Sequence, residues 1–199
     1  MRLGILIPYY NNHPECENRF RKLMKTITKQ VNDNIQVRVY EDGGYSNWLS
    51  LYNINVEYSL INKGVAYARN ILILNNTFDY IMFLDSDDMI DCDFIRKMYE
   101  MAGTNEYDMI ISKFIMNKKE IIYDKRSNVA GICLRTEFIK GLTFNEDYNI
   151  SEDALFIEEV YKRNPRIGKI DSNYYYNYGA NPDSLMMRFE RSELNLMKE

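Results

Sequence analysis

The sequence has 199 residues, of which 46% are hydrophobic and 14% aromatic, with nine glycines and four prolines. This composition excludes collagen-like, low-complexity and disordered chains, and the length suits one compact domain. The 25 lysines and arginines against 29 aspartates and glutamates give a net charge of −4, so we do not expect a nucleic acid as the main partner. A local basic groove remains compatible with this charge.

Cysteine and histidine usage narrows the possible chemistry. The cysteines, Cys16, Cys92 and Cys133, lie far apart and form no CxxC pair, which indicates a reducing compartment and no disulfide framework. His13 is the single histidine, so an HExxH zinc site is impossible and acid–base chemistry is expected to fall to carboxylates. No apolar run approaches the ~18 residues of a membrane span, and the apolar start is shorter than a signal sequence needs. We therefore expect a cytoplasmic protein without a transmembrane segment.

The first 90 residues alternate between strand patterns and helix patterns. Strands are predicted over 3–8, 35–40, 55–60 and 79–84, and helices over 15–31 and 65–74. Continuous apolar runs such as 3–8 are typical of strands that are covered on both faces. The alternation predicts an α/β fold with a mixed, mainly parallel central sheet flanked by helices.

The second half is predicted to be less regular, with a small antiparallel element. The predicted elements are helices over 91–102 and 152–163, strands over 108–112 and 173–178, and an antiparallel hairpin that joins 114–116 to 121–123. Residues 185–197 are expected to form a helical tail that packs on the core, with a homodimer contact or a membrane contact as alternatives. The mixed charges of this tail argue against a strongly basic membrane-binding face. No repeat or linker interrupts the chain, so one domain over 1–199 is predicted.

An acidic run follows the predicted strand at 79–84. The run consists of Asp85, Ser86, Asp87 and Asp88. It stands at the carboxyl end of a strand, where open α/β sheets bind their ligands. Carboxylates gathered there repel one another unless a cation offsets their charge, and hard oxygen ligands suit Mg²⁺ or Mn²⁺ shared with a diphosphate. An EF-hand is excluded by the residues at its fifth and sixth positions, and the remaining alternative is a solvated turn that caps the next helix.

Five short motifs stand at the ends of the predicted strands and at helix starts. They are Pro8-Tyr9-Tyr10-Asn11, Glu41-Asp42-Gly43, Asn62-Lys63-Gly64 with Ala68-Arg69-Asn70, Leu84-Asp85-Ser86-Asp87-Asp88, and Ser151-Glu152-Asp153-Ala154-Leu155-Phe156. With a weaker segment at 176–184, they resemble the inverting glycosyltransferases of family two over about 3–185. The resemblance implies the GT-A fold, which is Rossmann-like and binds a nucleotide. It also implies a nucleotide-binding half over 1–90, an acceptor half over 91–185 and a C-terminal helical tail over 186–199.

The resemblance implies a metal-assisted reaction with a nucleotide-sugar donor, and a UDP-sugar in particular. The residues that it assigns to the donor are Pro8, Tyr10, Asn11, Asp42, Lys63, Arg69, Asp85 and Ser86. In this arrangement Tyr10 stacks on the base, Asp42 accepts a hydrogen bond from it, and the two basic residues add positive charge near the phosphates. Asp87, with Asp85, binds Mn²⁺ or Mg²⁺, which acts as a Lewis acid for the leaving diphosphate. A surface salt bridge or a helix-end charge is the alternative role for each basic residue.

Inversion in one displacement needs a base opposite the leaving group. The resemblance assigns this role to Asp153, with Glu152 as the alternative. Both stand at the predicted start of a helix whose apolar side chains are expected to face the core. These apolar residues are Leu155, Phe156 and Val160. The structural alternative is acidic charge that complements the helix dipole, with Ser151 as the cap.

The chain departs from the family pattern and leaves its substrates open. Many relatives carry a late histidine that completes the metal site, and residues 174–188 contain none. The tyrosines at 174–176 and 178 either line a sugar cleft or alternate between the core and the surface of a strand. The acceptor is an unidentified glycan, lipid-linked, protein or small-molecule hydroxyl. The alternative functions are a nucleotidyltransferase, which is disfavoured because no glycine-rich loop follows the first strand, and an inactive nucleotide-sugar-binding module.

Overall fold

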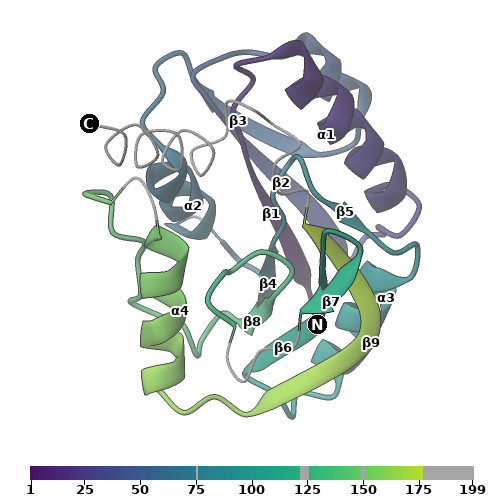
Figure 1. Cartoon of the computed structure of the whole chain (residues 1–199), viewed down its shortest axis with the longest axis vertical. Helices are drawn as coiled ribbons and strands as arrows, with labels where there is room; N and C mark the ends of the chain where they lie inside the picture. The colour runs from purple at the N-terminus through teal and green to yellow at the C-terminus, as the bar shows by residue number, and fades with distance from the viewer. Residues whose placement is uncertain (75, 122–125, 149–150, 177–199) are drawn as a thin grey trace, which may run out of the picture.

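The computed structural model of the chain contains one mixed sheet with helices on both faces (Figure 1). The structure describes residues 1–74, 76–121, 126–148 and 151–176. The elements in chain order are β1 (Leu3–Tyr9), α1 (Pro14–Ile27), β2 (Ile35–Asp42), the 3-10 helix η1 (Asn47–Leu51), β3 (Asn55–Ser59), α2 (Val65–Leu74), β4 (Tyr80–Phe83), β5 (Met89–Ile90), α3 (Phe94–Gly103), β6 (Met109–Met116), β7 (Lys119–Ile121), β8 (Cys133–Arg135), α4 (Glu152–Lys162) and β9 (Ile167–Tyr176). The mixed α/β architecture predicted from the sequence is confirmed.

The first half of the sheet is parallel. Strand β1 lies between β2 and β4, with Leu3 opposite Ile35 on one side and Tyr80 on the other, and β3 extends the sheet beyond β2. Every residue of β1 is buried, which explains why its sequence is a continuous apolar run and does not alternate. Because these strands point the same way, the loops that follow β1, β2 and β4 leave the sheet at one edge.

The second half of the sheet is mostly antiparallel. Across the described residues the strand order is β3-β2-β1-β4-β8-β6-β9-β5, with β7 paired to β6. Strands β8 and β5 run antiparallel to their neighbours, whereas β6 and β9 are parallel to each other. The predicted antiparallel hairpin is present, but its turn is shorter than predicted: β7 already begins at Lys119, and the predicted strand residues 122 and 123 lie outside the described residues. Strands β6 and β7 are joined by Asn117 and Lys118, which both have positive φ, as a tight type I′ turn requires.

The helices cover both faces of the sheet. The buried side chains of α1 and α3 share one apolar cluster with one face of the strands, and those of α2 and α4 share a second cluster with the other face. Figure 1 shows the same division, with α2 and α4 on one side of the sheet and α1 and α3 on the other. Helices α2 and α4, which come from different halves of the chain, thus lie on the same face of the sheet.

Several element boundaries differ from the prediction. Helix α1 ends at Ile27, before the predicted end at 31: Thr28 is its C-cap, and beyond it the chain forms a tighter turn, in which the N–H of Gln30 donates to the carbonyl of Ile27 at 2.8 Å. Helix α3 starts at Phe94, after the predicted start at 91, because Asp91 continues the pairing of β5 with β9: its N–H donates to the Asn173 carbonyl at 3.1 Å. Strand β9 begins at 167, before the predicted start at 173, and the short strands β5 and β8 were not predicted.

The described part of the chain contains no helix that is long and apolar enough to cross a membrane. The tail expected at 185–197 and the last predicted strand residues, 177 and 178, lie outside the described residues. The homodimer contact through this tail therefore stays a prediction.

Gly131 offers a test of how closely the sheet is packed. It has a φ of +70°, and a Cβ at this position would lie 2.5 Å from the Tyr174 ring, whereas Gly141 has a φ of +79° and open space around it. We expect Gly131→Ala to lower the free energy of unfolding by about 2–4 kcal/mol, through backbone strain plus overpacking, and Gly141→Ala by about 1–2 kcal/mol, through strain alone. Urea unfolding of both variants measures this difference, and equal losses would contradict the packing described here.

Candidate functional site

Loops from separate strands meet at one edge of the sheet. Tyr10 follows β1, Asp42 ends β2, and the acidic run starts at Asp85 after β4; the parallel register of these strands aligns the three positions. Helix α4 starts with Glu152 and Asp153, and contacts described below join it to the acidic run. Four of the five sequence motifs therefore border one region. The remaining motif, Asn62-Lys63-Gly64, is connected to them through Asp42.

Asp42 fixes the loop that precedes α2. Its Oδ1 accepts the N–H of Lys63 at 2.9 Å, and its Oδ2 accepts the N–H of Gly64 at 2.7 Å. The residue is only 3% exposed, and burial raises its pKa although the two N–H groups lower it. Asp42 thus ties the Asn62-Lys63-Gly64 motif to the end of β2.

Tyr10 lies over this junction. A Cβ added to Gly43 would stand 3.0 Å from the Tyr10 ring and 3.0 Å from the Cβ of Asn62, and the φ of Gly43 is +90°. Tyr10 is 44% exposed, so its ring is available to a ligand. The ring, the glycine and the anchored loop together form a polar-lined surface on which a planar group can stack.

The remaining predicted donor residues lie in different environments. Pro8 is buried within β1, opposite Tyr40, and Asn11 is exposed in the loop that follows. The exposed Lys63 lies in the loop before α2 and turns toward that helix, where its Nζ donates to the Tyr67 hydroxyl at 3.1 Å. Ser86 is half-buried within the acidic run.

Arg69 joins the acidic run to α4. Its Nη2 donates to Asp85 Oδ1 at 2.9 Å, and its Nη1 donates to Glu152 Oε1 at 2.5 Å. The residue is 3% exposed; burial alone would lower its pKa, but Asp85 and Glu152 raise it, so the guanidinium stays charged. The sequence interpretation placed Arg69 near the phosphates, whereas the structure places its two terminal nitrogens on carboxylates of the protein.

Asn70 and Phe144 reinforce this connection. Asn70 Nδ2 donates to the Phe144 carbonyl at 2.9 Å, and its Oδ1 accepts the Phe144 N–H at 2.8 Å. The Phe144 ring stacks on Phe156 of α4 with ring centroids 4.1 Å apart, and the Arg69 guanidinium lies 5.4 Å from the Phe144 ring. Sequence reasoning missed Phe144 because it lies in a loop, where hydrophobic periodicity carries no signal.

Asp87 and Asp153 carry perturbed carboxyl groups. Burial and the neighbouring charge of Asp85 raise the pKa of Asp87 to about 6. Burial also raises the pKa of Asp153, Arg69 lowers it, and Asp85 raises it, with a net increase. Both side chains are half-buried, and the same Asp85 carboxylate acts on both, so the acidic run and the start of α4 share one electrostatic environment.

The end of β9 faces this environment. Burial raises the pKa of Tyr176, and the charges of Asp85, Asp88, Asp87 and Asp153 raise it further. Of the two alternatives for the tyrosines, the alternation between core and surface is observed over 174–176, since Tyr174 is fully buried, Tyr175 is 37% exposed and Tyr176 is half-buried; Tyr178 lies outside the described residues. The Tyr176 side chain is thus a candidate to line the site, a role that the sequence analysis left open for this group of tyrosines.

The carboxylates of the acidic run would supply only part of the ligand set of a hard divalent cation. Asp85 and Asp87 supply carboxylate oxygens, and their mutual repulsion, seen in the raised pKa of Asp87, is what a bound cation would relieve. Among the residues that the structure describes, no three histidine, cysteine, aspartate or glutamate side chains form a group that could hold a metal ion. This arrangement fits Mg²⁺ or Mn²⁺ whose remaining ligands come from water and a diphosphate.

The start of α4 corrects two expectations. Leu155 is 38% exposed and does not face the core; the buried apolar residues of the helix are Phe156, Ile157 and Val160. Ser151 occupies the N-cap position but has a φ of 68° and makes no side-chain capping bond. Acidic charge at the helix start therefore does not act with a serine cap, and the Glu152 carboxylate is directed to Arg69 instead.

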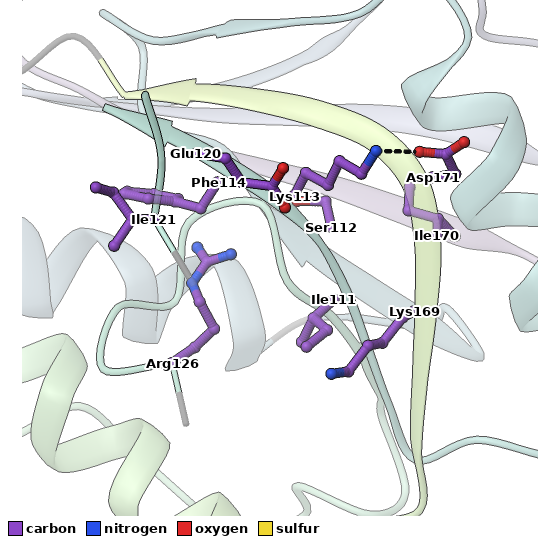
Figure 2. A pocket seen from close by; sticks show the side chains of 10 residues that line it. All are labelled: Ile111, Ser112, Lys113, Phe114, Glu120, Ile121, Arg126, Lys169, Ile170 and Asp171. Atoms are coloured by element: carbon purple, nitrogen blue, oxygen red, sulfur yellow. Dashed lines mark ion pairs between the residues drawn. The ribbon is translucent and has the colours of Figure 1, made fainter. Parts of the chain in front are cut away.

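Figure 2 shows a pocket in another part of the sheet. Its lining comes from β6, β7 and β9 together with Arg126, and it includes the ion pair between Lys113 and Asp171 at 2.5 Å. None of the residues that the sequence assigned to the donor, the metal or the base lines this pocket. We therefore place the candidate site at the loops described above.

Comparison with known proteins identifies the family and the fold. The model of the family described as Glycosyl transferase family 2 matches residues 4–164. The chain is 24% identical to the minor teichoic acid biosynthesis protein GgaA of Bacillus subtilis over an alignment of 222 residues. The alignment covers 93% of this chain and 49% of GgaA. The chain thus spans about half the length of this relative.

Solved structures share the architecture. S. aureus TarS 1–349 in complex with UDP-GlcNAc has a TM-score of 0.75 and 20% identity, covering 88% of this chain and 58% of that one. The mannosyltransferase PcManGT from Pyrobaculum calidifontis, in complex with GDP-Man and Mn²⁺, has a TM-score of 0.67 and 13% identity, covering 89% and 58%. These likenesses show the fold alone, and it is the GT-A fold that the sequence predicts.

The buried ion pairs of Arg69 can be compared with an exposed pair. Removing the guanidinium leaves Glu152 and Asp85 uncompensated, and breaking a buried pair costs about 3–5 kcal/mol. We expect Arg69→Met to lower the free energy of unfolding by that amount and Arg69→Lys by less. The control is Arg96→Met, because Arg96 pairs with Glu100 at 2.7 Å while both side chains are more than half exposed. The free energy of unfolding of Arg96→Met, measured in urea, should match that of the wild type. An equally unchanged value for Arg69→Met would show that Arg69 does not hold the acidic run and α4 together.

Proposed function

The chain belongs to glycosyl transferase family 2, and on that premise we propose that it transfers one sugar from a UDP-sugar to an acceptor hydroxyl with inversion at the anomeric carbon. The observation that carries the proposal is the double pairing of Arg69 with Asp85 and Glu152. This pairing sets Asp153 beside the acidic run, so that one sugar can lie between a leaving diphosphate and a base. TarS bound to UDP-GlcNAc supports the choice of a UDP-sugar.

The nucleobase is proposed to bind at the junction of β1 and β2. The exposed Tyr10 ring offers a stacking face, and the absence of a side chain at Gly43 lets the ring pack closely against the anchored loop. Asp42 is anchored by two backbone N–H groups, and a carboxylate has about four acceptor sites, so it keeps capacity for the imide N–H of uracil. Because uracil offers this donor, the arrangement favours a uridine nucleotide.

Asp85 and Asp87 are proposed to face the diphosphate. A divalent cation bound between their carboxylates and the phosphates would stabilise the charge that develops on the leaving UDP. PcManGT, solved with Mn²⁺, supports this choice of cofactor. The fixed charge of Arg69 pairs with Asp85, which limits the repulsion within the acidic run.

Asp153 is proposed as the base, with Glu152 in a positioning role. Glu152 is 6% exposed and its carboxylate is paired with Arg69, whereas Asp153 is half-buried. In the reaction the acceptor oxygen forms the new bond to the anomeric carbon while the bond from that carbon to the diphosphate breaks. The acceptor proton passes to Asp153 and the electron pair leaves with UDP. A nucleotidyltransferase, the alternative enzyme class, gains no support from the family match.

Replacing Asp87 should remove the contribution of the metal to nucleotide binding. We expect Mn²⁺ to tighten UDP binding by the wild type and by Asp147→Asn, whose carboxylate is exposed elsewhere. In Asp87→Asn the Mn²⁺-dependent gain should fall tenfold or more, as for loss of a metal ligand, while binding of UDP alone stays unchanged. Isothermal titration calorimetry measures both affinities. An undiminished Mn²⁺-dependent gain in UDP affinity in Asp87→Asn would contradict the proposed role of Asp87 as a metal ligand.

Replacing Asp153 should separate chemistry from binding. We expect Asp153→Asn to release UDP from a UDP-sugar about 10²–10⁴-fold more slowly than the wild type, with unchanged UDP affinity. Glu152→Gln should slow the reaction less and lower the free energy of unfolding more, because it weakens the pairing with Arg69. Retained turnover in Asp153→Asn would refute the assignment.

The same base sets the expected pH dependence. A base works only when deprotonated, and burial together with Asp85 raises the pKa of Asp153. The logarithm of kcat/KM should therefore fall with decreasing pH below that raised pKa, at a higher pH than an ordinary aspartate with a pKa of about 3.9 would give. The residual activity of Asp153→Asn should lack this acid limb. Measuring UDP release across pH in both proteins tests the expectation, and an identical limb in the variant would exclude Asp153 as its source.

A further inference from the structure

Tyr174 connects the buried strand β9 to the acidic run. Its side chain is fully buried, its hydroxyl donates to Asp88 Oδ2, and it accepts the N–H of Asp85 in a long hydrogen bond at 3.4 Å. Asp88 is itself 2% exposed, and its N–H closes a turn onto the Asp85 carbonyl at 3.2 Å. One hydroxyl thus contacts both ends of the turn that contains Asp87.

The Tyr174 ring is held on several sides. Phe114 stacks on it with centroids 5.9 Å apart and an interplanar angle of 13°, and Phe94 packs at 6.2 Å. The backbone of Gly131 lies so close that a Cβ there would stand 2.5 Å from the ring. Gly131 is in turn bound to β4, where its N–H donates to the Phe83 carbonyl at 2.8 Å. The hydroxyl therefore has little freedom to move away from the acidic run.

The chemistry of the hydroxyl suits this location. Buried carboxylates need hydrogen-bond donors, and a neutral hydroxyl supplies one without adding a charge that would compete with a bound cation. Burial and the charges of Asp88 and Asp85 keep the pKa of Tyr174 well above its usual value, so it remains a donor. Tyr174 contacts the backbone of Asp85, while Arg69 holds its carboxylate at 2.9 Å.

We propose that Tyr174 is a positioning residue that holds the Asp85–Asp88 turn in the arrangement that receives a divalent cation with a nucleoside diphosphate. The proposal rests on the proposed function of the acidic run. Without the hydroxyl, repulsion between Asp85 and Asp87 is free to open the turn before the cation binds. Residues that orient metal ligands typically contribute 10–100-fold to metal affinity, and we expect Tyr174 to act within that range.

The test compares Tyr174→Phe with a matched buried tyrosine. Tyr80 is 1% exposed and its hydroxyl donates to the Tyr107 carbonyl at 2.6 Å, at the start of β4, whereas the acidic run follows the end of that strand. Tyr80→Phe therefore also loses one buried hydrogen bond but leaves the acidic run intact. Two quantities are measured on the full chain: amide hydrogen exchange at Asp85 and Asp88 without ligand, and the UDP affinity with and without Mn²⁺.

We expect Tyr174→Phe to exchange these amides faster than the wild type and to lose about tenfold or more of the Mn²⁺-dependent gain in UDP affinity. Binding of UDP alone should be unchanged, and Tyr80→Phe should match the wild type in both measurements. In the background of Asp88→Ala, the effect of Tyr174→Phe should shrink, because its partner is gone. Unchanged exchange and an unchanged Mn²⁺ effect in Tyr174→Phe would overturn the proposal while the proposed function stands.

Failure of the proposed function gives a different result. If Mn²⁺ does not tighten UDP binding by the wild type, the metal part of the proposed function falls. The exchange measurement then still decides whether Tyr174 holds the turn. Faster amide exchange in Tyr174→Phe, but not in Tyr80→Phe, supports this role, and equal exchange in the wild type and both variants overturns it.

Discussion

One buried guanidinium determines the geometry of the candidate site. Arg69 comes from α2 and pairs with Asp85 at the end of β4 and with Glu152 at the start of α4. Separating these segments would leave buried charges without partners, which is far more costly than losing an exposed ion pair. Because a planar guanidinium binds both carboxylates in fixed directions, it sets the distance between the acidic run and α4. The rest of the site is arranged around this connection.

The acidic residues near this edge divide into two groups by their environment. Asp42, Asp88 and Glu152 are almost fully buried, and each accepts a hydrogen bond that holds a loop, a turn or a helix start. Burial raises the pKa of Asp42 and Glu152 too, but Asp87 and Asp153 differ in being only half-buried and in having a pKa that the charge of Asp85 also raises. Perturbed carboxyl groups of this kind cluster at functional sites, and here they lie on either side of the Arg69 connection. In the acidic run and at the start of α4, the buried carboxylates of Asp88 and Glu152 thus stand next in sequence to the half-buried carboxylates of Asp87 and Asp153, which are the ones proposed for the chemistry.

Local patterns predicted the first half of the fold well, and long-range contacts account for what they missed. Strands β1 and β4 were visible in the sequence because burial on both faces gives a continuous apolar run, and helix α2 was predicted at its observed bounds, 65–74. Strands β5 and β8 are too short to show any period, and the alternation of β9 is hidden by Gly168 and Ser172 at buried positions. The motifs indicated the region of the candidate site, and its residue roles stay predictions; the pairing of Arg69 with Glu152 spans 83 residues, and no local pattern reports such a contact.

A crystal structure of the chain with UDP-GlcNAc and Mn²⁺ tests the central claim most directly. The account predicts cation density against Asp87 and the diphosphate, with Arg69 still bridging Asp85 and Glu152, and with the Asp153 carboxylate on the opposite side of the anomeric carbon from UDP. A nucleotide bound away from the acidic run would contradict it. So would an Asp153 carboxylate turned into a separate cavity, too far away to reach an acceptor hydroxyl on the same sugar.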